Sequence, residues 1–199
     1  YMYSVNREGV DRFAYQTQGA IRGGITVAVG PQSLYFGSDD RCLYCLDRLT
    51  GRKKWAYPAG APIVGVPCAD PGTAEIRSRM VYCPVFNEGI VALQYTMPPP
   101  VKATAKASVT QTFDESFSVK WQVPDALAVV GVSPTHVYLG KRSEAQRHEE
   151  DMPKMKEVII VDKFTGDIVG RWTPPRCDFI LRNHNDWARA VDPDPMKII

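Results

Sequence analysis

The chain contains 199 residues with a formal net charge of +2 at pH 7, and 44% of its residues are hydrophobic. A net charge this close to zero argues against nucleic acid or an anionic membrane as a partner, and no apolar run approaches the roughly 18 residues of a membrane span. The 16 Pro and 15 Gly punctuate short apolar stretches, which is typical of an all-β domain with many turns. No signal peptide is visible and Tyr1 already lies within a repeat, so we expect further residues upstream.

A repeated pattern of strand, polar turn and strand begins at the first residue. Tyr1–Tyr15 (YMYSVNREGVDRFAY) matches Leu43–Tyr57 (LYCLDRLTGRKKWAY) with one residue fewer in the turn, and has Asn6 and Phe13 where the second copy has an Asp and a Trp. The two copies are about 42 residues apart, inside the roughly 40–45 residues of a four-stranded propeller blade. Tyr1–Tyr15 is therefore predicted to form the third and outermost strands of a blade.

The pattern returns further along the chain. Val81–Gln94 overlays Leu34–Asp47 without a gap, and Val158–Gly166 repeats Leu43–Gly51. These matches give four repeat units at approximately 1–30, 31–70, 80–132 and 136–175, with 176–199 as the start of a further blade or a tail. Period-two alternation within the units predicts antiparallel strands at about 34–37, 42–47, 53–57, 63–69, 80–85, 89–94, 118–123, 127–132, 136–140, 158–162 and 168–172.

The sharpest part of the repeat is a spacing of a small residue, any residue, Asp, three residues, Gly, three residues and Trp. Cys45, Asp47, Gly51 and Trp55 occupy these positions in one copy. The spacing is that of the tryptophan-docking motif of the PQQ-like (pyrroloquinoline-quinone-type) β-propeller repeat family, and the chain resembles this family as far as about Trp172.

The other copies depart from the motif. The last copy keeps Asp162 and Gly166, but Gly170 holds the tryptophan position and Trp172 follows two residues later. Trp121 repeats the motif tryptophan after a longer connection. A shift of two residues keeps a side chain on the same face of a strand, so we expect Trp172 to take the place of the motif tryptophan.

The motif also has a physical interpretation of its own. Asp47 ends a strand, where its carboxylate can accept the backbone N–H groups of a tight turn, and Gly51 is free to adopt a positive φ. A large ring at Trp55, Trp121 or Trp172 covers the backbone of the adjacent blade, and its burial stabilises the fold by roughly 2–3 kcal/mol. These side chains are therefore expected to be structural, with ligand stacking as the alternative.

The predicted fold class is all-β, and the resemblance implies a β-propeller of four-stranded antiparallel blades that closes as a ring of seven or eight. The chain is long enough for about four such blades. Four blades in an arc expose two apolar blade faces, which favours aggregation. We therefore expect an incomplete ring or a fragment of a 7–8-bladed propeller, whose remaining blades come from further chain or from a second copy.

Two stretches interrupt the repeat. Thr96–Phe117 contains three consecutive Pro and is expected to be an extended surface connection. Lys141–Glu157 replaces a short hairpin turn with a charged insertion, which we expect to be a solvated loop with a short helix within 143–152. A segment that binds a partner is the alternative for this insertion.

Cysteine chemistry is limited. Cys42 and Cys45 are three residues apart, and side chains at that spacing on a strand point to opposite faces, which suits neither a metal nor a disulfide. Cys68 and Cys83 lie on consecutive predicted strands and form either a disulfide or, as we expect, two buried thiols. With Cys177 the count is odd, so at least one thiol has no intrachain partner.

Histidines and paired carboxylates do not indicate a catalytic centre. The three histidines share no metal-ligand spacing and neighbour no plausible nucleophile; they are His136, His148 and His184. Asp39 and Asp40 are adjacent, so they face opposite ways on a strand, and Asn87-Glu88-Gly89 fills the same position in the next unit. Turn chemistry explains both stretches, and no catalytic residue, metal or cofactor is predicted.

The resemblance implies two functions of different classes. The first is a non-enzymatic scaffold for protein–protein or ligand binding, similar to the family branch that contains the propeller lipoprotein of outer-membrane barrel assembly. That branch implies protein partners, no cofactor and a periplasmic or extracytoplasmic location. The alternative is a fragment of a quinoprotein alcohol or sugar dehydrogenase, which holds pyrroloquinoline quinone and Ca²⁺. Such enzymes characteristically have a vicinal Cys-Cys pair, which this sequence lacks, so the scaffold is the favoured hypothesis.

Overall fold

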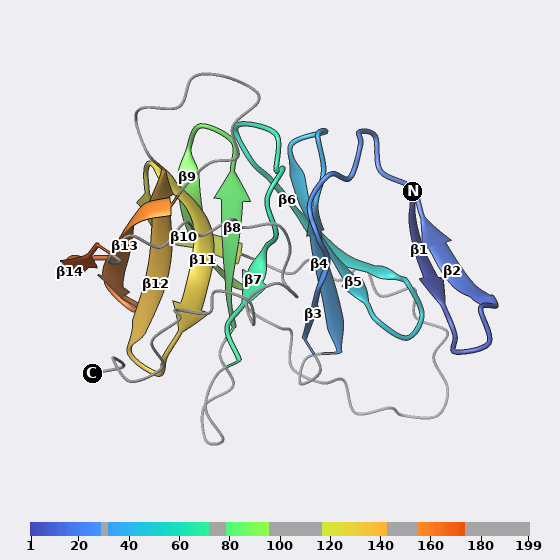
Figure 1. Ribbon diagram of the computed structural model, residues 1–199. Helices are drawn as coiled ribbons and strands as arrows, with labels where there is room; N and C mark the ends of the chain where they lie inside the picture. Colours follow the sequence, from blue (N-terminus) through green and yellow to red (C-terminus); the bar gives the residue numbers. More distant parts are fainter. Residues whose placement is uncertain (29–31, 72–78, 96–116, 143–154, 174–199) are drawn as a thin grey trace, which may run out of the picture.

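The computed structural model describes residues 1–28, 32–71, 79–95, 117–142 and 155–173 (Figure 1). Within these ranges the chain forms fourteen β-strands and no helix, so the prediction of an all-β fold is confirmed. The strands form one two-stranded sheet and three four-stranded sheets. In Figure 1 the four sheets stand side by side in chain order, from the N-terminal hairpin at one end to the strand that ends at Trp172 at the other.

Each sheet is an antiparallel meander of strands in chain order. The first sheet consists of β1 (Met2–Val5) and β2 (Asp11–Tyr15). The second contains β3 (Thr26–Ala28), β4 (Ser33–Gly37), β5 (Cys42–Asp47) and β6 (Lys53–Pro58). The third contains β7 (Cys68–Ala69), β8 (Met80–Val85), β9 (Gly89–Tyr95) and β10 (Phe117–Val123). The fourth contains β11 (Ala126–Val132), β12 (His136–Arg142), β13 (Met155–Asp162) and β14 (Ile168–Trp172).

The middle strands are apolar on both faces because each sheet packs between two others. On a strand successive side chains point to opposite faces, so the run Leu34-Tyr35-Phe36 contributes to two cores. Leu34 and Phe36 lie in the core shared with the first sheet, which also contains Met2. Tyr35 lies in the core shared with the third sheet, which also contains Cys83.

The same alternation continues into the third and fourth sheets. Tyr82 and Ala92 of the third sheet face Leu139 and Ile159 of the fourth sheet across a further core, which is closed by Trp121. Three successive cores thus lie between four successive sheets. A sheet of this kind cannot stand alone in water, because both of its faces need a neighbour.

The predicted strands agree with the observed ones within a few residues, with one clear exception. The strand expected at 63–69 is reduced to Cys68–Ala69, because Ile63 instead donates its backbone N–H to the Ser38 carbonyl in the loop region of the second sheet. The helix expected within 143–152 and the further blade or tail at 176–199 lie outside the described residues.

The sheets are offset by one strand from the sequence repeat units. β3, β7 and β11 lie at the ends of the units 1–30, 31–70 and 80–132, yet each of them pairs with the strand that follows it. A sequence repeat has no intrinsic starting point, whereas hydrogen bonding assigns every strand to one sheet. The innermost strand of each four-stranded sheet therefore comes from the end of the preceding repeat unit.

The first sheet corresponds to the outer half of the others. Ser4 of β1 pairs with Phe13 of β2 in the way that Cys45 of β5 pairs with Trp55 of β6. β1 and β2 are thus the third and outermost strands, as the repeat predicts. Among the described residues, the first sheet has no counterpart of the two inner strands β3 and β4.

Candidate functional site

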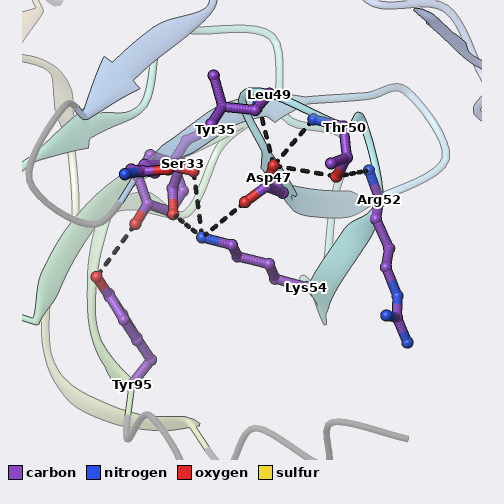
Figure 2. Close-up of polar contacts among 9 residues, drawn as sticks. Ser33, Tyr35, Asp47, Leu49, Thr50, Arg52, Lys54 and Tyr95 are labelled. Carbon is purple, nitrogen blue, oxygen red and sulfur yellow. Dashed lines mark hydrogen bonds and ion pairs between the residues drawn. The ribbon is translucent and has the colours of Figure 1, made fainter. Parts of the chain in front are cut away.

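The connection from the third to the outermost strand is organised by one side-chain oxygen. In the second sheet, Asp47 Oδ1 accepts hydrogen bonds from the backbone N–H of Leu49 at 3.0 Å and of Thr50 at 2.9 Å, and from the Thr50 hydroxyl at 3.0 Å (Figure 2). Gly51 closes the turn with φ of 71°, a conformation that glycine adopts without a steric penalty. The turn hydrogen bonds that the sequence predicts for Asp47 are present.

The same turn recurs in the first and fourth sheets. Asn6 Oδ1 accepts from the backbone N–H groups of Glu8 at 3.0 Å and Val10 at 2.8 Å. Asp162 Oδ1 accepts from those of Phe164 and Thr165, both at 2.9 Å. The closing glycines again have positive φ, 79° at Gly9 and 84° at Gly166. We call these three segments, Asn6–Val10, Asp47–Arg52 and Asp162–Asp167, the docking turns.

Hydrogen bonding also sets the charge state of the turn carboxylates. Burial alone would raise the pKa of Asp47, but the hydrogen bonds from Thr50 and Leu49 and the nearby Lys54 ammonium lower that pKa below its usual value. The pKa of Asp162 is lowered by the backbone hydrogen bonds from Thr165 and Phe164. Both carboxylates are therefore ionised in the folded protein at neutral pH.

Lys54 links the turn of the second sheet to the start of β4. Its Nζ lies 3.0 Å from Ser33 Oγ, 3.2 Å from the Gln32 carbonyl and 3.8 Å from Asp47 Oδ2 (Figure 2).

Beneath this surface network, the Tyr35 and Tyr95 hydroxyls meet at 3.2 Å between the second and third sheets. Burial is the main cause that raises the pKa of Tyr35 well above its usual value, so the Tyr35 hydroxyl acts as a neutral hydrogen-bonding group.

An aromatic side chain from one sheet rests on the docking turn of the next sheet. Trp121 of β10 donates its indole N–H to the Lys163 carbonyl at 2.9 Å, and a Cβ added to Gly166 would lie only 2.4 Å from Trp121 Cβ. Phe13 of β2 covers Gly51 in the same way, since a Cβ there would lie 2.3 Å from Phe13 Cδ2. The motif residues therefore join consecutive sheets, and the glycine leaves room for the ring.

Trp55 lies at the equivalent position between the second and third sheets. It is 5% exposed, and its ring centroid is 5.8 Å from that of Tyr35, 5.7 Å from that of Tyr95 and 6.2 Å from that of Phe117. Its indole N–H is buried and has no hydrogen-bond partner in the described part of the chain. In the third sheet the residues that follow Tyr95, where the other sheets have a docking turn, lie outside the described ranges.

The expectation that Trp172 takes the place of the motif tryptophan stays a prediction. Trp172 pairs with Val158 and Gly170 pairs with Ile160, so Gly170 holds the place that Trp55 holds opposite Cys45. Trp172 is 50% exposed, because no further sheet among the described residues covers this side of the fourth sheet.

The cysteines in the described ranges are free thiols. Cys83 belongs to the core between the second and third sheets, whereas Cys68 packs against the core between the third and fourth. Because they face opposite sides of one sheet, the disulfide alternative for this pair is wrong. Burial raises the pKa of Cys68 to about 11, which leaves it protonated and unreactive. Cys177 lies outside the described residues.

The other candidate catalytic residues make local polar contacts. Asp39 pairs with Arg22 at 2.6 Å, while Asp40 accepts hydrogen bonds from the Gln18 N–H and the Tyr44 hydroxyl, so the two carboxylates have separate partners. His136 Nδ1 lies 2.8 Å from the Thr135 hydroxyl in a tight turn. His148 and His184 lie outside the described residues, and among the residues described no three His, Cys, Asp or Glu side chains form a cluster that could hold a metal ion.

Sequence reasoning missed a buried ion pair between the third and fourth sheets. Lys163 Nζ lies 2.7 Å from Asp70 Oδ2, and the two side chains are 6% and 1% exposed. The Lys163 ammonium also donates to the Ser133 carbonyl at 3.5 Å. Asp70 follows the innermost strand β7, and Lys163 follows the motif residue Asp162 directly, which is the only local signal that the sequence offers.

The docking turns also expose apolar side chains. Val10, Leu49 and Phe164 are 60%, 46% and 70% exposed. The backbone N–H of each donates to the turn Asn or Asp, so each side chain projects from a fixed backbone. All three turns connect the third strand of a sheet to its outermost strand, which places them along the same rim of the stack of sheets.

Comparison with solved structures identifies the fold. The chain is similar to BamB from Moraxella catarrhalis, with a TM-score of 0.56 and 14% identity over 83% of this chain and 41% of that chain. It is also similar to the β-propeller domain of Cps50 (Swd1) from Myceliophteria thermophila, with a TM-score of 0.51 and 14% identity over 78% of this chain and 42% of that chain. The chain spans less than half the length of either protein.

These likenesses confirm the predicted β-propeller of four-stranded antiparallel blades, and at this level of identity they show the fold alone. No family model matches the chain. No curated protein matches it either. Among the described residues there is no helix that is long and apolar enough to cross a membrane.

Proposed function

We propose that the chain is part of a non-enzymatic β-propeller scaffold of the PQQ-like repeat type, which binds a protein partner along the rim formed by the docking turns. The observation that carries this proposal is the repeated exposure of an apolar side chain on a fixed turn. Phe164 is 70% exposed and Leu49 is 46% exposed, and both occupy the second position after the motif Asp.

The energetics of such a rim favour binding. An apolar side chain on a mobile loop loses conformational entropy when a partner immobilises it, which weakens the interaction. Here the backbone is already fixed by hydrogen bonds to Asp47 and Asp162, so less entropy remains to be lost. Aromatic residues at such positions often carry much of the binding free energy, and Phe164 is the best candidate anchor.

The motif residues have a structural role in this proposal. Asp47 and Asp162 fix the turns, Gly51 and Gly166 leave room for an aromatic ring, and Trp121 closes a seam between sheets. Cys45 and Trp55 form the matching cross-strand pair of the second sheet. The remaining blades of the ring come from further chain or from a second copy. The extracytoplasmic location remains an implication of the family resemblance.

A photo-crosslinking experiment tests the proposed rim. A photoreactive amino acid placed at Leu49 or Phe164 should trap the same defined protein in cells of the native host. Val119 of β10 is the control position, because it is similarly exposed, at 51%, but lies along an outer strand. The double variant L49S/F164S should lose the purified complex while its unfolding midpoint stays unchanged. Equal crosslinking from all three positions would contradict the rim.

The alternative of a quinoprotein dehydrogenase is tested separately. Purified protein is supplied with pyrroloquinoline quinone and Ca²⁺, and dye reduction is followed with a panel of alcohols and sugars. We expect no saturable rate. A Ca²⁺-dependent rate that saturates with substrate would overturn the scaffold proposal in favour of the enzyme.

A further inference from the structure

We propose that the docking turn of the second sheet binds an acidic segment of the protein partner, in which carboxylates lie on either side of an apolar side chain. The surface consists of residues 47–54, which we call the basic turn. The proposal rests on the proposed function, because the acidic segment is the part of the partner that meets this place on the rim.

Positive charge is concentrated on one of the three docking turns. Residues 47–54 (DRLTGRKK) contain four basic residues and one acidic residue, so their net charge is +3. The equivalent residues of the other two docking turns, 6–12 and 162–169, have net charges of 0 and −1. Because the whole chain carries only +2, the charge of the basic turn is a local feature of this turn.

Lys54 and Asp47 compensate each other within the basic turn. Lys54 Nζ lies 3.8 Å from Asp47 Oδ2 and also 3.0 Å from Ser33 Oγ. In Figure 2 the Lys54 side chain reaches toward Asp47, whereas Leu49 and Arg52 extend away from that carboxylate. The charge that a partner meets therefore comes from other residues of the turn.

Two exposed cations supply that charge. Arg52 and Lys53 are both exposed, and Lys53 has no ion-pair partner among the described residues. Arg48 is half-buried, and its equivalent in the fourth sheet, Lys163, pairs with Asp70 inside the fold, so Arg48 is not needed for recognition. Adjacent cations of this kind suit two neighbouring carboxylates, and the arginine can form a bidentate pair with one of them.

Leu49 favours a peptide over a simple anion. Its side chain is 46% exposed and its backbone N–H is held by Asp47 at 3.0 Å, three residues before Arg52 in the same turn. A phosphate group, a nucleic acid backbone or an acidic polysaccharide would neutralise the cations but leave Leu49 in water. A peptide can bring an apolar side chain to Leu49 and carboxylates to the cations at once. Two exposed cations are also few for a polyanion, whose affinity depends on the number of charges neutralised.

The uneven charge also determines how the partner lies along the rim. Charges at the edge of an interface act mainly on the association rate and on the choice between binding modes. The turn of the fourth sheet has a net charge of −1, so it repels an acidic segment. We expect the acidic segment over the basic turn, and a segment without carboxylates over Phe164.

A blocked peptide of sequence SEDLDES is the probe, and amide NMR of the full chain follows its binding. The largest shifts should lie within residues 48–54. The amide version SQNLNQS should bind at least about tenfold more weakly, since it keeps the shape and removes the charge. The version SEDSDES should bind at least about threefold more weakly, because it lacks the apolar side chain. Raising NaCl from about 50 to about 300 mM should weaken SEDLDES far more than SQNLNQS.

Two charge-reversed variants of the chain locate the site. R52E/K53E should lose binding of SEDLDES by at least about tenfold. R41E/K120E is the matched control, because it changes the net charge equally at two exposed residues outside the basic turn, and it should bind almost as the unchanged chain does. Urea midpoints show that both variants are folded, and R52Q/K53Q replaces the first variant if it is not.

The outcomes separate this proposal from the proposed function. Equal losses in the two charge-reversed variants, or equal binding of SEDLDES and SEDSDES, would overturn the acidic segment, because the surface would then attract anions without selection. F164S should bind the peptide as the unchanged chain does, and a loss there would also overturn it. Photo-crosslinking at Leu49 without peptide binding would leave the rim and remove the acidic segment. Peptide binding without any crosslinked partner would remove the rim instead.

Discussion

A single side-chain oxygen fixes each docking turn, and the glycine that closes it serves two purposes. At Gly166 the positive φ completes the turn, and the missing Cβ makes room for the ring of Trp121. At Gly9 the φ is similar, at 79°, but a Cβ there would meet nothing within 4 Å. A side chain at Gly9 would therefore meet backbone strain alone, whereas a side chain at Gly166 would meet both backbone strain and the Trp121 ring.

We expect Gly166→Ala to destabilise the protein clearly more than Gly9→Ala. Both variants place an L side chain in the left-handed region, which costs about 1–2 kcal/mol. Gly166→Ala also forces its Cβ against Trp121, a further overpacking cost of about 1–3 kcal/mol. Urea unfolding of the two variants measures the difference. Equal losses would mean that the ring does not rest on the turn.

The carboxylates of the docking turns predict a loss of stability in acid. The pKa values of Asp47 and Asp162 are lowered in the folded protein, whereas an unfolded Asp has a pKa of about 3.9. The folded state thus binds these protons less tightly, so their stabilisation is complete above about pH 4 and is lost as the pH falls through the folded-state values.

The variants Asp47→Asn and Asp162→Asn test this pH dependence. Asn keeps the accepting oxygen, as Asn6 does in the first sheet, but it cannot titrate. The double variant should show a smaller fall in the urea midpoint between pH 6 and pH 3 than the unchanged chain. Parallel curves for the two proteins would exclude these carboxylates as the cause.

At the scale of the elements, the two buried tryptophans differ in how the indole N–H is used. Trp121 donates its N–H to the turn beneath it. Trp55 instead lies among Tyr35, Tyr95 and Phe117, with its N–H unpaired among the described residues. Trp121 therefore combines ring burial with an indole hydrogen bond, whereas Trp55 contributes ring burial without an indole hydrogen bond among the described residues.

We expect Trp121→Phe to cost more stability than Trp55→Phe. Both changes remove a similar volume of ring, but only the first breaks a buried hydrogen bond and leaves the Lys163 carbonyl without its indole donor, a loss of about 1–3 kcal/mol. Trp55→Phe removes a buried unpaired N–H, which offsets the lost packing. Urea unfolding compares the two variants. A larger loss from Trp55→Phe would point to an acceptor for Trp55 beyond the described residues.

The sequence was most informative where neighbouring residues determine the structure. The Asp47 turn, the positive φ of Gly51 and the buried Trp55 all follow from residue type and spacing within eleven positions. Spacing alone does not fix the place of Trp172, because a shift of two keeps the strand face but moves the ring along the strand. The ion pair between Asp70 and Lys163 was missed because it joins residues from different repeat units, and nothing local to either residue indicates its partner.

For the whole molecule, the order of the sheets depends on contacts that differ from seam to seam. Apolar burial alone would allow one blade to pack against several others, because all the blades share the same alternation. The seam between the third and fourth sheets carries the one ion pair between described sheets that is almost fully buried on both sides. A charge pair of this kind penalises a wrong neighbour, since a mispaired blade would leave a buried charge alone.

This role predicts the behaviour of Lys163→Met and Asp70→Leu. Each single variant leaves one buried charge without its partner, which costs about 3–5 kcal/mol. The double variant removes both charges and replaces them with apolar side chains, so it should recover most of that loss. A double-mutant cycle from urea unfolding measures the coupling.

The shape of the unfolding transition shows whether the ion pair fixes the order of the sheets. If the pair fixes the order of the sheets, a single variant should loosen the fourth sheet first, so that exchange of β12 amides separates from the main transition. The double variant should unfold in one step again, because its seam is apolar throughout. Single variants that unfold in one step with small losses would show that the pair is solvated in solution and that packing alone orders the blades.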